Sequence, residues 1–254
     1  MISGVAPPAM RRMALAAMEE HLVDDDTGLL KLLTPPLQNA RPSAGYIQAY
    51  PPGVRENGGQ YSHAGVWALI AQAMNGDGDA AYRYFTGLSP AHRAAHPTRG
   101  AAYEIEPYVM AGDVYSEPPY VGRGGWSWYT GSAAWMHRAA LEHLFGMRQR
   151  GNEVSFTPCL PSHWDDAELA LTQHGRTLRV LFCRADATDA LDRARRAGAV
   201  GHAAGAPWCW DDASAPECLL LQLDATRRRP TPAGASIRWA TDEGLPRVGT
   251  SSIR

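Results

Sequence analysis

The spacing of the apolar residues changes at Gly151, and this change restricts the folds open to the chain. Before Gly151 the apolar side chains recur at helical spacing, most clearly over residues 61–74. After it, the segments EVSFTP, ELALTQ and RTLRVLF have the character of short strands joined by turns such as QHGR. We therefore predict a mainly α chain, with a helical portion at 1–150 and the start of a small β domain at 151–183.

Three segments of the first portion carry strong helical patterns, at residues 9–23, 61–74 and 136–145, and a shorter helix is expected at 79–87. The apolar stripe of the first consists mainly of Met10, Met13, Leu15, Met18 and Leu22. That of the second consists of His63, Val66, Trp67, Ile70 and Met74. Residues 29–54 are rich in proline and predict a long ordered loop. Loops of this length inside compact domains are usually functional or disordered. Paired helices with long loops on one side suggest a helical toroid or bundle.

The strand pattern fades beyond Cys183. Residues 184–254 are rich in Ala, Arg, Asp, Gly and Pro, and offer one short apolar patch, CLLLQL. We expect this segment to be a divergent tail that is either disordered or the product of a frameshift in GC-rich DNA. Family-like strands in the neighbouring reading frames would support the frameshift, and their absence would exclude it.

Charge and cysteine usage exclude several classes of function. The formal net charge of −2 and the sequence pI near 6.5 do not favour nucleic acid or an anionic membrane as partner. No apolar run approaches the roughly 20 residues that a membrane span needs, and the N-terminus does not resemble a signal peptide. The four cysteines form no CxxC pair and no zinc-type spacing with histidine, so we predict no metal site and a reduced, cytoplasmic setting.

The densest group of polar residues is RENGGQYSH, at 55–63. Its two adjacent glycines let the backbone approach a neighbour closely, and His63 opens the helix that follows. A hydrogen-bonded histidine of the core is one interpretation of His63, since it lies on the apolar face. An anion ligand is the other, because a helix N-terminus presents unpaired N–H groups and a partial positive charge.

A second candidate group is WYTGSAAW, at residues 128–135, which also begins a helix. Thr130 is either an N-cap, whose hydroxyl satisfies a backbone N–H, or part of an anion cradle together with the N–H of Gly131. The two interpretations cannot be separated by spacing. The sequence therefore leaves both open.

The segment between these groups is rich in aromatic and acidic residues. Its aromatic side chains are candidates for the lining of a carbohydrate cleft, since aromatic faces stack on sugar rings, although core packing explains some of them: Tyr103, Tyr108, Tyr115, Tyr120, Trp126, Trp128 and Tyr129. Glycosidic bond cleavage needs a proton donor. Glu106 and Asp113, seven positions apart, could share a helix face, but such residues more often cap helices or pair with arginine.

Four stretches together carry a resemblance to a known family: RENGGQYSHAGVWALIAQAM, GDGDAAYRYF, EPYVMAGDVYSEPPYVGRGGWSWYTGSAAWMHRAALEHLFGMRQRG and FTPCLPSHW. They are similar to the C-terminal part of the glycoside phosphorylases of glycoside hydrolase family 94. The likeness is greatest to the phosphorylase-like region of cyclic β-1,2-glucan synthases and to 1,2-β-oligoglucan phosphorylases, and it runs from about residue 1 to 182.

The resemblance implies an (α/α)6 barrel followed by a small β domain, and inverting phosphorolysis of a β-glucan. Inorganic phosphate is then the co-substrate, with no other cofactor. By motif, His63, Thr130 and Gly131 resemble the phosphate ligands of the family. Glu56 resembles a residue on the leaving-group side of the sugar, and Trp128 is the candidate aromatic contact.

The resemblance also implies that the catalytic acid lies elsewhere. The general acid of the family is an aspartate in a Trp-Asn-Asp type motif, upstream of where this chain begins. The string HWDD at 163–166 falls in the β region and is not that motif. We thus assign no catalytic residue and expect the isolated chain to be inactive and, as part of a barrel, prone to association.

The resulting hypothesis is a C-terminal fragment of a β-glucan phosphorylase or cyclic glucan synthase, with β-1,2-linked glucans as the preferred substrates. The missing upstream part of the same enzyme is a candidate partner, and a longer relative could be membrane-anchored. Two alternatives remain open: a non-catalytic carbohydrate-binding or complementing module, and a fragment of an α-toroid glycoside hydrolase.

Overall fold

The computed structural model describes residues 2–225 of the chain. The described residues are 34% helix and 21% strand, so the chain is mixed α and β rather than mainly α. A helical part precedes a β region, as predicted, but the described helices do not show a barrel. The chain divides into two compact units, Met1–Ala140 and Leu141–Arg254. Residues 226–254 of the expected divergent tail lie outside the described residues.

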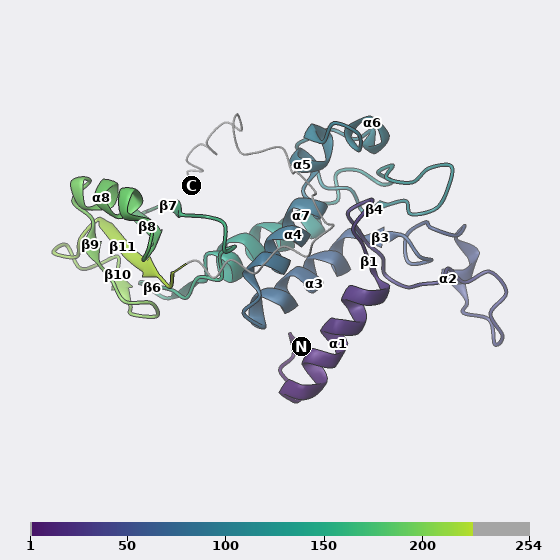
Figure 1. Cartoon of the computed structure of the whole chain (residues 1–254), viewed down its shortest axis with the longest axis horizontal. Coiled ribbons are helices and arrows are strands. Elements are labelled where there is room, and N and C mark those ends of the chain that lie inside the picture. The colour runs from purple at the N-terminus through teal and green to yellow at the C-terminus, as the bar shows by residue number, and fades with distance from the viewer. Residues whose placement is uncertain (1, 226–254) are drawn as a thin grey trace. The chain divides into compact units, whose positions relative to one another are not determined.

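The first unit contains the longer helices of the chain (Figure 1). Its elements are α1 (Pro8–His21), β1 (Val23–Asp24), β2 (Leu29–Leu30), α2 (Tyr46–Ala49), β3 (Gln60–Tyr61), α3 (Ser62–Met74), α4 (Gly78–Leu88), α5 (Pro90–Ala95), α6 (Gly100–Tyr103), β4 (Asp113–Val114) and α7 (Thr130–Arg138). β1 pairs with β2, and β3 pairs with β4, both antiparallel. The long loop predicted at 29–54 is mostly irregular, apart from β2 and the single turn of α2.

The core of this unit forms where α3 packs against α4 and α7 (Figure 1). Val66, Leu69 and Ile70 of α3 are buried there with Tyr84 and Leu88 of α4. Buried apolar area of this kind contributes about 25 cal/mol per Å². Gly65 allows the close approach of α3 and α4, since a Cβ at this position would lie 2.7 Å from Cδ2 of Leu88.

The apolar stripes that were predicted for α1 and α3 are only partly buried. In α1, Leu15 is the buried residue, whereas Met10 and Met13 are 61% and 72% exposed. In α3, Trp67 and Met74 are close to half exposed. Helical spacing located both helices and part of each buried face, since Val66, Ile70 and Leu15 are buried, but it predicted a wider covered stripe than the structure has.

The helix that was predicted at 136–145 is interrupted. α7 ends at Arg138, and a π-helical turn, η1, follows over Ala139–Leu144. A π-helix has a wider turn than an α-helix, so the 3.6-residue pattern does not locate the change. Gly146, with φ of +69°, then ends the helical segment.

The second unit contains two small sheets. β5 (Met147–Arg150), β6 (Glu153–Phe156) and β10 (Trp208–Cys209) form the first, in the order β10-β6-β5. β7 (Asp166–Gln173), β8 (Arg176–Arg184), β9 (Val200–Gly201) and β11 (Cys218–Leu223) form the second, in the order β7-β8-β11-β9. β7 and β8 form a hairpin whose turn residues, His174 and Gly175, both have positive φ, as its QHGR sequence favours.

Residues 184–225 belong to the segment where we expected a divergent tail, either disordered or frameshifted. They form one helix and three strands, so this part of the segment is ordered. α8 (Thr188–Arg196) connects β8 to strands that run parallel to it, because a parallel pair needs a long crossover. α8 buries only Ala190, Leu191 and Ala194. Three small or medium apolar residues give a weak periodic signal, which explains why the helix was missed. The patch CLLLQL is β11, which lies between β8 and β9.

Candidate functional site

The loop before α3 is held in place by side chains that are themselves buried. Asn57 is fully buried, and its amide bonds to the backbone of Leu37, as acceptor at 2.6 Å and donor at 2.9 Å, and to the carbonyl of Tyr50 at 2.8 Å. Ser116 donates to the carbonyl of Gly58 at 2.8 Å. Such bonds satisfy the polar groups of a buried loop and fix its conformation.

The two adjacent glycines of this loop serve the packing of the loop itself. A Cβ at Gly59 would lie within 2.9 Å of the backbone of Gly53 and Arg55, and one at Gly58 would lie 2.7 Å from Pro36. Gly58 also has φ of +94°. The close approach that the pair allows is therefore an approach to neighbouring chain segments.

His63 lies in the first turn of α3, as predicted. Its ring contacts Trp67 of the same helix and Trp135 of α7, with centroid separations of 4.8 and 5.7 Å. Its Nε2 atom is buried and has no hydrogen-bond partner within the described part of the chain. A buried polar atom without a partner costs about 1–3 kcal/mol, so this atom is suited to a ligand. The missing hydrogen bond at Nε2 does not support the interpretation of His63 as a hydrogen-bonded core residue.

Thr130 and Gly131 are the first two residues of α7, and both are exposed. The residue at the N-cap is Tyr129, not Thr130, and no side chain caps this end of the helix. The N-cap interpretation of Thr130 is therefore wrong. The first N–H groups of an uncapped helix remain available to an anion. A Cβ at Gly131 would meet no atom within 4 Å, so the space in front of it is open.

The helix starts of α3 and α7 are connected by a pair of tyrosines. The hydroxyls of Tyr61, which precedes α3, and Tyr129, which precedes α7, are 2.7 Å apart. The hydrogen bond to Tyr129, together with burial, raises the pKa of Tyr61 to about 12. Backbone hydrogen bonds also link the two segments. The N–H of Ser62 donates to the carbonyl of Gly112, and the N–H of Tyr129 donates to the carbonyl of Met110, both at 3.0 Å. The structure thus brings the segments of His63 and Thr130 together.

The two candidate sugar contacts differ in their surroundings. Glu56 lies in the buried loop, and its Oε2 atom is buried without a hydrogen-bond partner among the residues that the structure describes. Trp128 is 62% exposed, has φ of +59°, and packs edge-on to the exposed Tyr108, with the ring centroids 6.2 Å apart. Left-handed backbone at a large non-glycine residue is strained and is often associated with function.

The carboxylates that we considered as proton donors are not on a shared helix face. Glu106 lies in an irregular segment, and Asp113 begins β4, where it is almost fully buried. The possibility of a shared helix face is excluded because residues 104–112 are irregular, and helical spacing does not apply to such a segment. Asp166 of the string HWDD begins β7 in the second unit and pairs with Arg193 at 2.5 Å.

Sequence reasoning missed several residues that shape this site. Gln60 is fully buried, and its Oε1 accepts from the backbone N–H of Leu30 at 2.9 Å. Arg93, also buried, donates to the carbonyls of Gly28 at 2.7 Å and Gly87 at 2.5 Å. Its burial lowers the pKa of the guanidinium to about 10. The contacts with Leu30 and Gly28 join residues 30 and 65 positions apart, so no local pattern indicates them.

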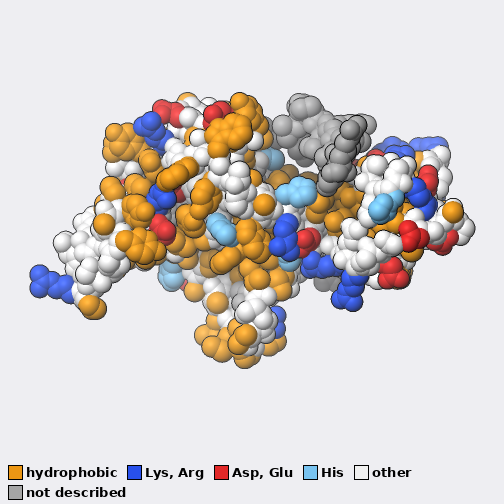
Figure 2. All heavy atoms as spheres, turned by 180° about the vertical axis from the view of Figure 1, so that it is seen from behind, with side chains coloured by type: hydrophobic (Ala, Val, Ile, Leu, Met, Phe, Trp, Pro, Cys, Tyr) orange, Lys and Arg blue, Asp and Glu red, His pale blue; other side chains and the backbone are white. Residues whose placement is uncertain are grey.

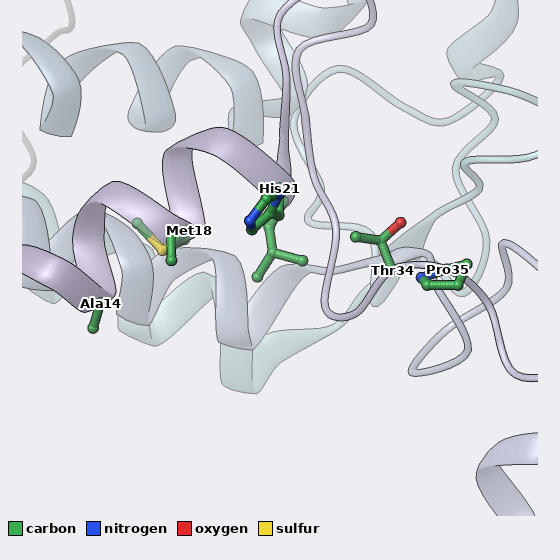
Figure 3. Close-up of a pocket in the computed structure, with 7 residues that line it drawn as sticks. Ala14, Met18, His21, Thr34 and Pro35 are labelled. Atoms are coloured by element: carbon green, nitrogen blue, oxygen red, sulfur yellow. The ribbon is translucent and has the colours of Figure 1, made fainter.

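A separate pocket lies beside α1 and is shown in Figure 3. It has a volume of about 560 Å³ and is lined by Ala14, Ala17, Met18, His21, Leu22, Thr34 and Pro35, none of which is a candidate site residue. Among residues 2–225, no group of three or more His, Cys, Asp or Glu side chains could hold a metal ion. No helix in the same range has both the length and the apolar character needed to cross a membrane.

Comparison with known families identifies the helical unit. Residues 1–146 match the model of the glycosyl hydrolase 94 superfamily, catalytic domain. The chain belongs to this superfamily. Residues 147–192 of this glycosyl hydrolase 94 chain match a second model, that of the glycosyl hydrolase family 65, C-terminal domain. The resemblance deduced from the four sequence stretches is thereby confirmed.

Relatives of this glycosyl hydrolase 94 chain include a glucan synthase and disaccharide phosphorylases. It is 42% identical to the cyclic beta-(1,2)-glucan synthase NdvB of Rhizobium meliloti (strain 1021) over 183 residues. The matched segment covers 72% of the chain and 6% of the relative. The chain is 29% identical over 178 residues to the solabiose phosphorylase of Paenibacillus borealis, covering 69% and 22%. For the N,N'-diacetylchitobiose phosphorylase of Vibrio proteolyticus, the identity is 27% over 186 residues, covering 70% and 22%.

These relatives are much longer than the segment they share with the chain. The chain spans 6% of the glucan synthase and 22% of each of the two phosphorylases. It therefore corresponds to a part of a glycoside phosphorylase-like region.

Proposed function

We propose that this chain supplies the phosphate-binding part, and one wall of the sugar-binding part, of a site for inverting phosphorolysis of β-glucans, with β-1,2-linked glucans preferred. The supporting observation is the unpartnered, buried Nε2 of His63, on a helix start that a tyrosine pair ties to the uncapped start of α7. In this proposal residues 1–150 belong to an (α/α)6 barrel, and a C-terminal β domain begins at 151.

The phosphate side needs donors rather than a general base. Inorganic phosphate is already an anion, so it can attack the anomeric carbon without the base that an inverting hydrolase uses to activate water. His63 would donate from its ring, Thr130 from its hydroxyl, and Gly131 from its backbone N–H. Because two helix N-termini converge there, their partial positive charges would also stabilise the anion.

The sugar side would be formed by the neighbouring loops. Glu56 would accept hydrogen bonds from sugar hydroxyls at its free Oε2, and Trp128 would stack on a sugar face. Trp126, which is 62% exposed, and the exposed Tyr108 widen this aromatic surface.

The proton donor would come from outside this chain. We assign no catalytic acid to the described carboxylates, because Asp113 is buried against backbone N–H groups and Asp166 is ion-paired in the second unit. The missing upstream part of the same enzyme is the proposed source of that aspartate. In this proposal the chain acts in the cytoplasm, with phosphate as co-substrate.

Two measurements test the proposal. We expect the chain alone to release no glucose 1-phosphate from β-1,2-glucooligosaccharides, since loss of a dedicated proton donor costs about 10²–10⁴ in rate. We also expect calorimetry to detect phosphate binding that His63→Ala abolishes. His137→Ala, an exposed histidine later in α7, is the matched control and should bind phosphate normally. Unchanged phosphate binding by His63→Ala would contradict the proposal.

The exposed apolar side chains of α1 favour a second candidate function, that of a complementing module without activity of its own. Recovery of phosphorolysis on mixing with a chain that carries the upstream part would support it. In the hydrolase alternative, water rather than phosphate attacks the anomeric carbon. This alternative would be favoured if glucan cleavage were observed and added phosphate changed neither the rate nor the product.

A further inference from the structure

Asp113 is a buried carboxylate that no part of the proposed reaction uses. It begins β4, where its backbone lies opposite Tyr61 of β3, and its exposed fraction is 1%. A buried charge is costly unless hydrogen bonds or an opposite charge compensate it. No ion pair to Asp113 is present within residues 2–225, so hydrogen bonds must supply the compensation.

The hydrogen bonds of this carboxylate go to the backbone of two different loops. Oδ2 accepts from the N–H of Arg55 at 2.9 Å, and Oδ1 accepts from the N–H of Trp126 at 3.4 Å. The carbonyl of Asp113 also accepts from the N–H of Gly125, at 2.9 Å. The first loop carries Glu56, and the second carries Trp128.

The two loops also contact each other directly, through the side chains of Arg55 and Trp126. The guanidinium of Arg55 lies over the ring of Trp126, 4.6 Å from its centroid, which is the geometry of a cation–π contact. Arg55 has φ of +48°, an uncommon backbone conformation that its surroundings must maintain. A Cβ at Gly125 would lie 2.2 Å from Oδ1 of Asp113, so only glycine permits this loop to approach the carboxylate so closely.

We infer that Asp113 is a positioning residue that holds the Glu56 loop and the Trp128 loop at a fixed separation for a glucan chain. The inference rests on the proposed function, because it assigns a role in the binding of sugar. The carboxylate faces the protein backbone and transfers no proton. The phosphate candidates lie on α3 and α7, which the Tyr61–Tyr129 pair and the packing of the helices hold together. The hydrogen bonds of the Asp113 carboxylate go to Arg55 and Trp126, which lie outside both helices.

The decisive experiment compares Asp113→Asn with Glu106→Gln in the full chain. Asparagine keeps the shape of the side chain but replaces one acceptor oxygen by a donor, so one of the two backbone bonds is lost. Glu106 is a half-buried carboxylate seven positions away that bonds to neither loop. Calorimetry with a β-1,2-glucooligosaccharide and, separately, with inorganic phosphate gives both affinities for each variant.

We expect Asp113→Asn to bind the glucan about tenfold more weakly, as loss of one charge-assisted hydrogen bond implies. Its phosphate affinity should stay within about twofold of the parent, and Glu106→Gln should match the parent for both ligands. Equal losses of glucan and phosphate affinity would overturn the inference, because they indicate general loosening. Unchanged glucan affinity would overturn it as well.

Amide hydrogen exchange of the unmodified chain provides a test that does not depend on the variant folding. The amide hydrogens of Arg55 and Trp126 should exchange at least about tenfold more slowly than those of exposed loop residues. Fast exchange at both positions would overturn the inference. If the amides are protected but the unmodified chain binds no glucan, the proposed function has failed, and the positioning role fails with it.

Discussion

At the scale of single residues, the pair of Tyr61 and Tyr129 makes stability depend on pH. The hydrogen bond between Tyr61 and Tyr129, together with burial, raises the pKa of Tyr61 from 10.0 to about 12. The folded chain therefore retains the phenolic proton of Tyr61 more tightly than the unfolded chain. The contribution of the tyrosine pair to folding stability is complete below pH 10 and declines as the pH rises toward 12. The pair therefore stabilises the junction of α3 and α7 at neutral pH.

Tyr61→Phe should lower the free energy of unfolding by about 1 kcal/mol at pH 7, the usual contribution of one hydrogen bond. The difference between the variant and the parent should shrink above pH 10. Urea unfolding at several pH values measures both. Tyr46→Phe is a suitable control, since Tyr46 is 67% exposed. A difference that stays constant up to pH 12 would contradict this explanation.

His63, Thr130 and Gly131 could be nominated from the sequence because they belong to short motifs at helix starts. His63 and Thr130 follow tyrosines in similar local settings, and the structure places both in the first turn of a helix. Asp113 could not be assigned in this way. Its role depends on contacts with Arg55, 58 positions away, and Trp126, 13 positions away, in segments without periodicity.

At the scale of elements, α1 is attached to α3 and α4 by one polar cluster. The carboxylate of Glu19 accepts from Nε2 of Gln72 at 2.9 Å, from Nη2 of Arg83 at 2.5 Å, and from the hydroxyl of Tyr84. The same arginine bonds to Asp25, which follows α1, at 2.7 Å. Since Leu15 is the only residue of α1 that is buried in the described structure, this cluster makes a large contribution to its attachment.

Glu19→Ala should destabilise the chain by about 2 kcal/mol, because it leaves the buried hydroxyl of Tyr84 without its acceptor and removes one of the two carboxylates that bond to Arg83. Glu20→Ala, at the adjacent exposed position, should change stability by less than about 0.5 kcal/mol. Urea unfolding of both variants gives the comparison. Equal effects would show that Glu19 does not attach α1.

The elements were predicted best where one residue pattern decides the structure. α3 and α4 begin and end within one residue of the predicted 61–74 and 79–87, since both carry apolar residues at helical spacing. α8 and η1 were missed for opposite reasons. α8 buries few apolar residues, and η1 shifts the register of a strongly apolar segment.

At the scale of the whole molecule, the exposed apolar side chains of α1 distinguish the chain from an ordinary globular protein. Met10 and Met13 are 61% and 72% exposed, and Val5, just before the helix, is 84% exposed. Figure 2 shows hydrophobic side chains covering this projecting helix. Large exposed apolar patches usually mark an interaction surface. The phosphorylase relatives are several times longer than the matched segment, and further chain could cover this face in them.

We expect the isolated chain to self-associate through this face, because burying a methionine side chain contributes about 1.5–3 kcal/mol. Met10→Gln combined with Met13→Gln should shift sedimentation toward the monomer without lowering the thermal midpoint, since neither side chain is buried. Val200→Thr, at a half-exposed apolar residue of the second unit, should leave association unchanged. If the double variant associates as strongly as the parent, another surface is responsible, and α1 loses its proposed role in completing a larger enzyme.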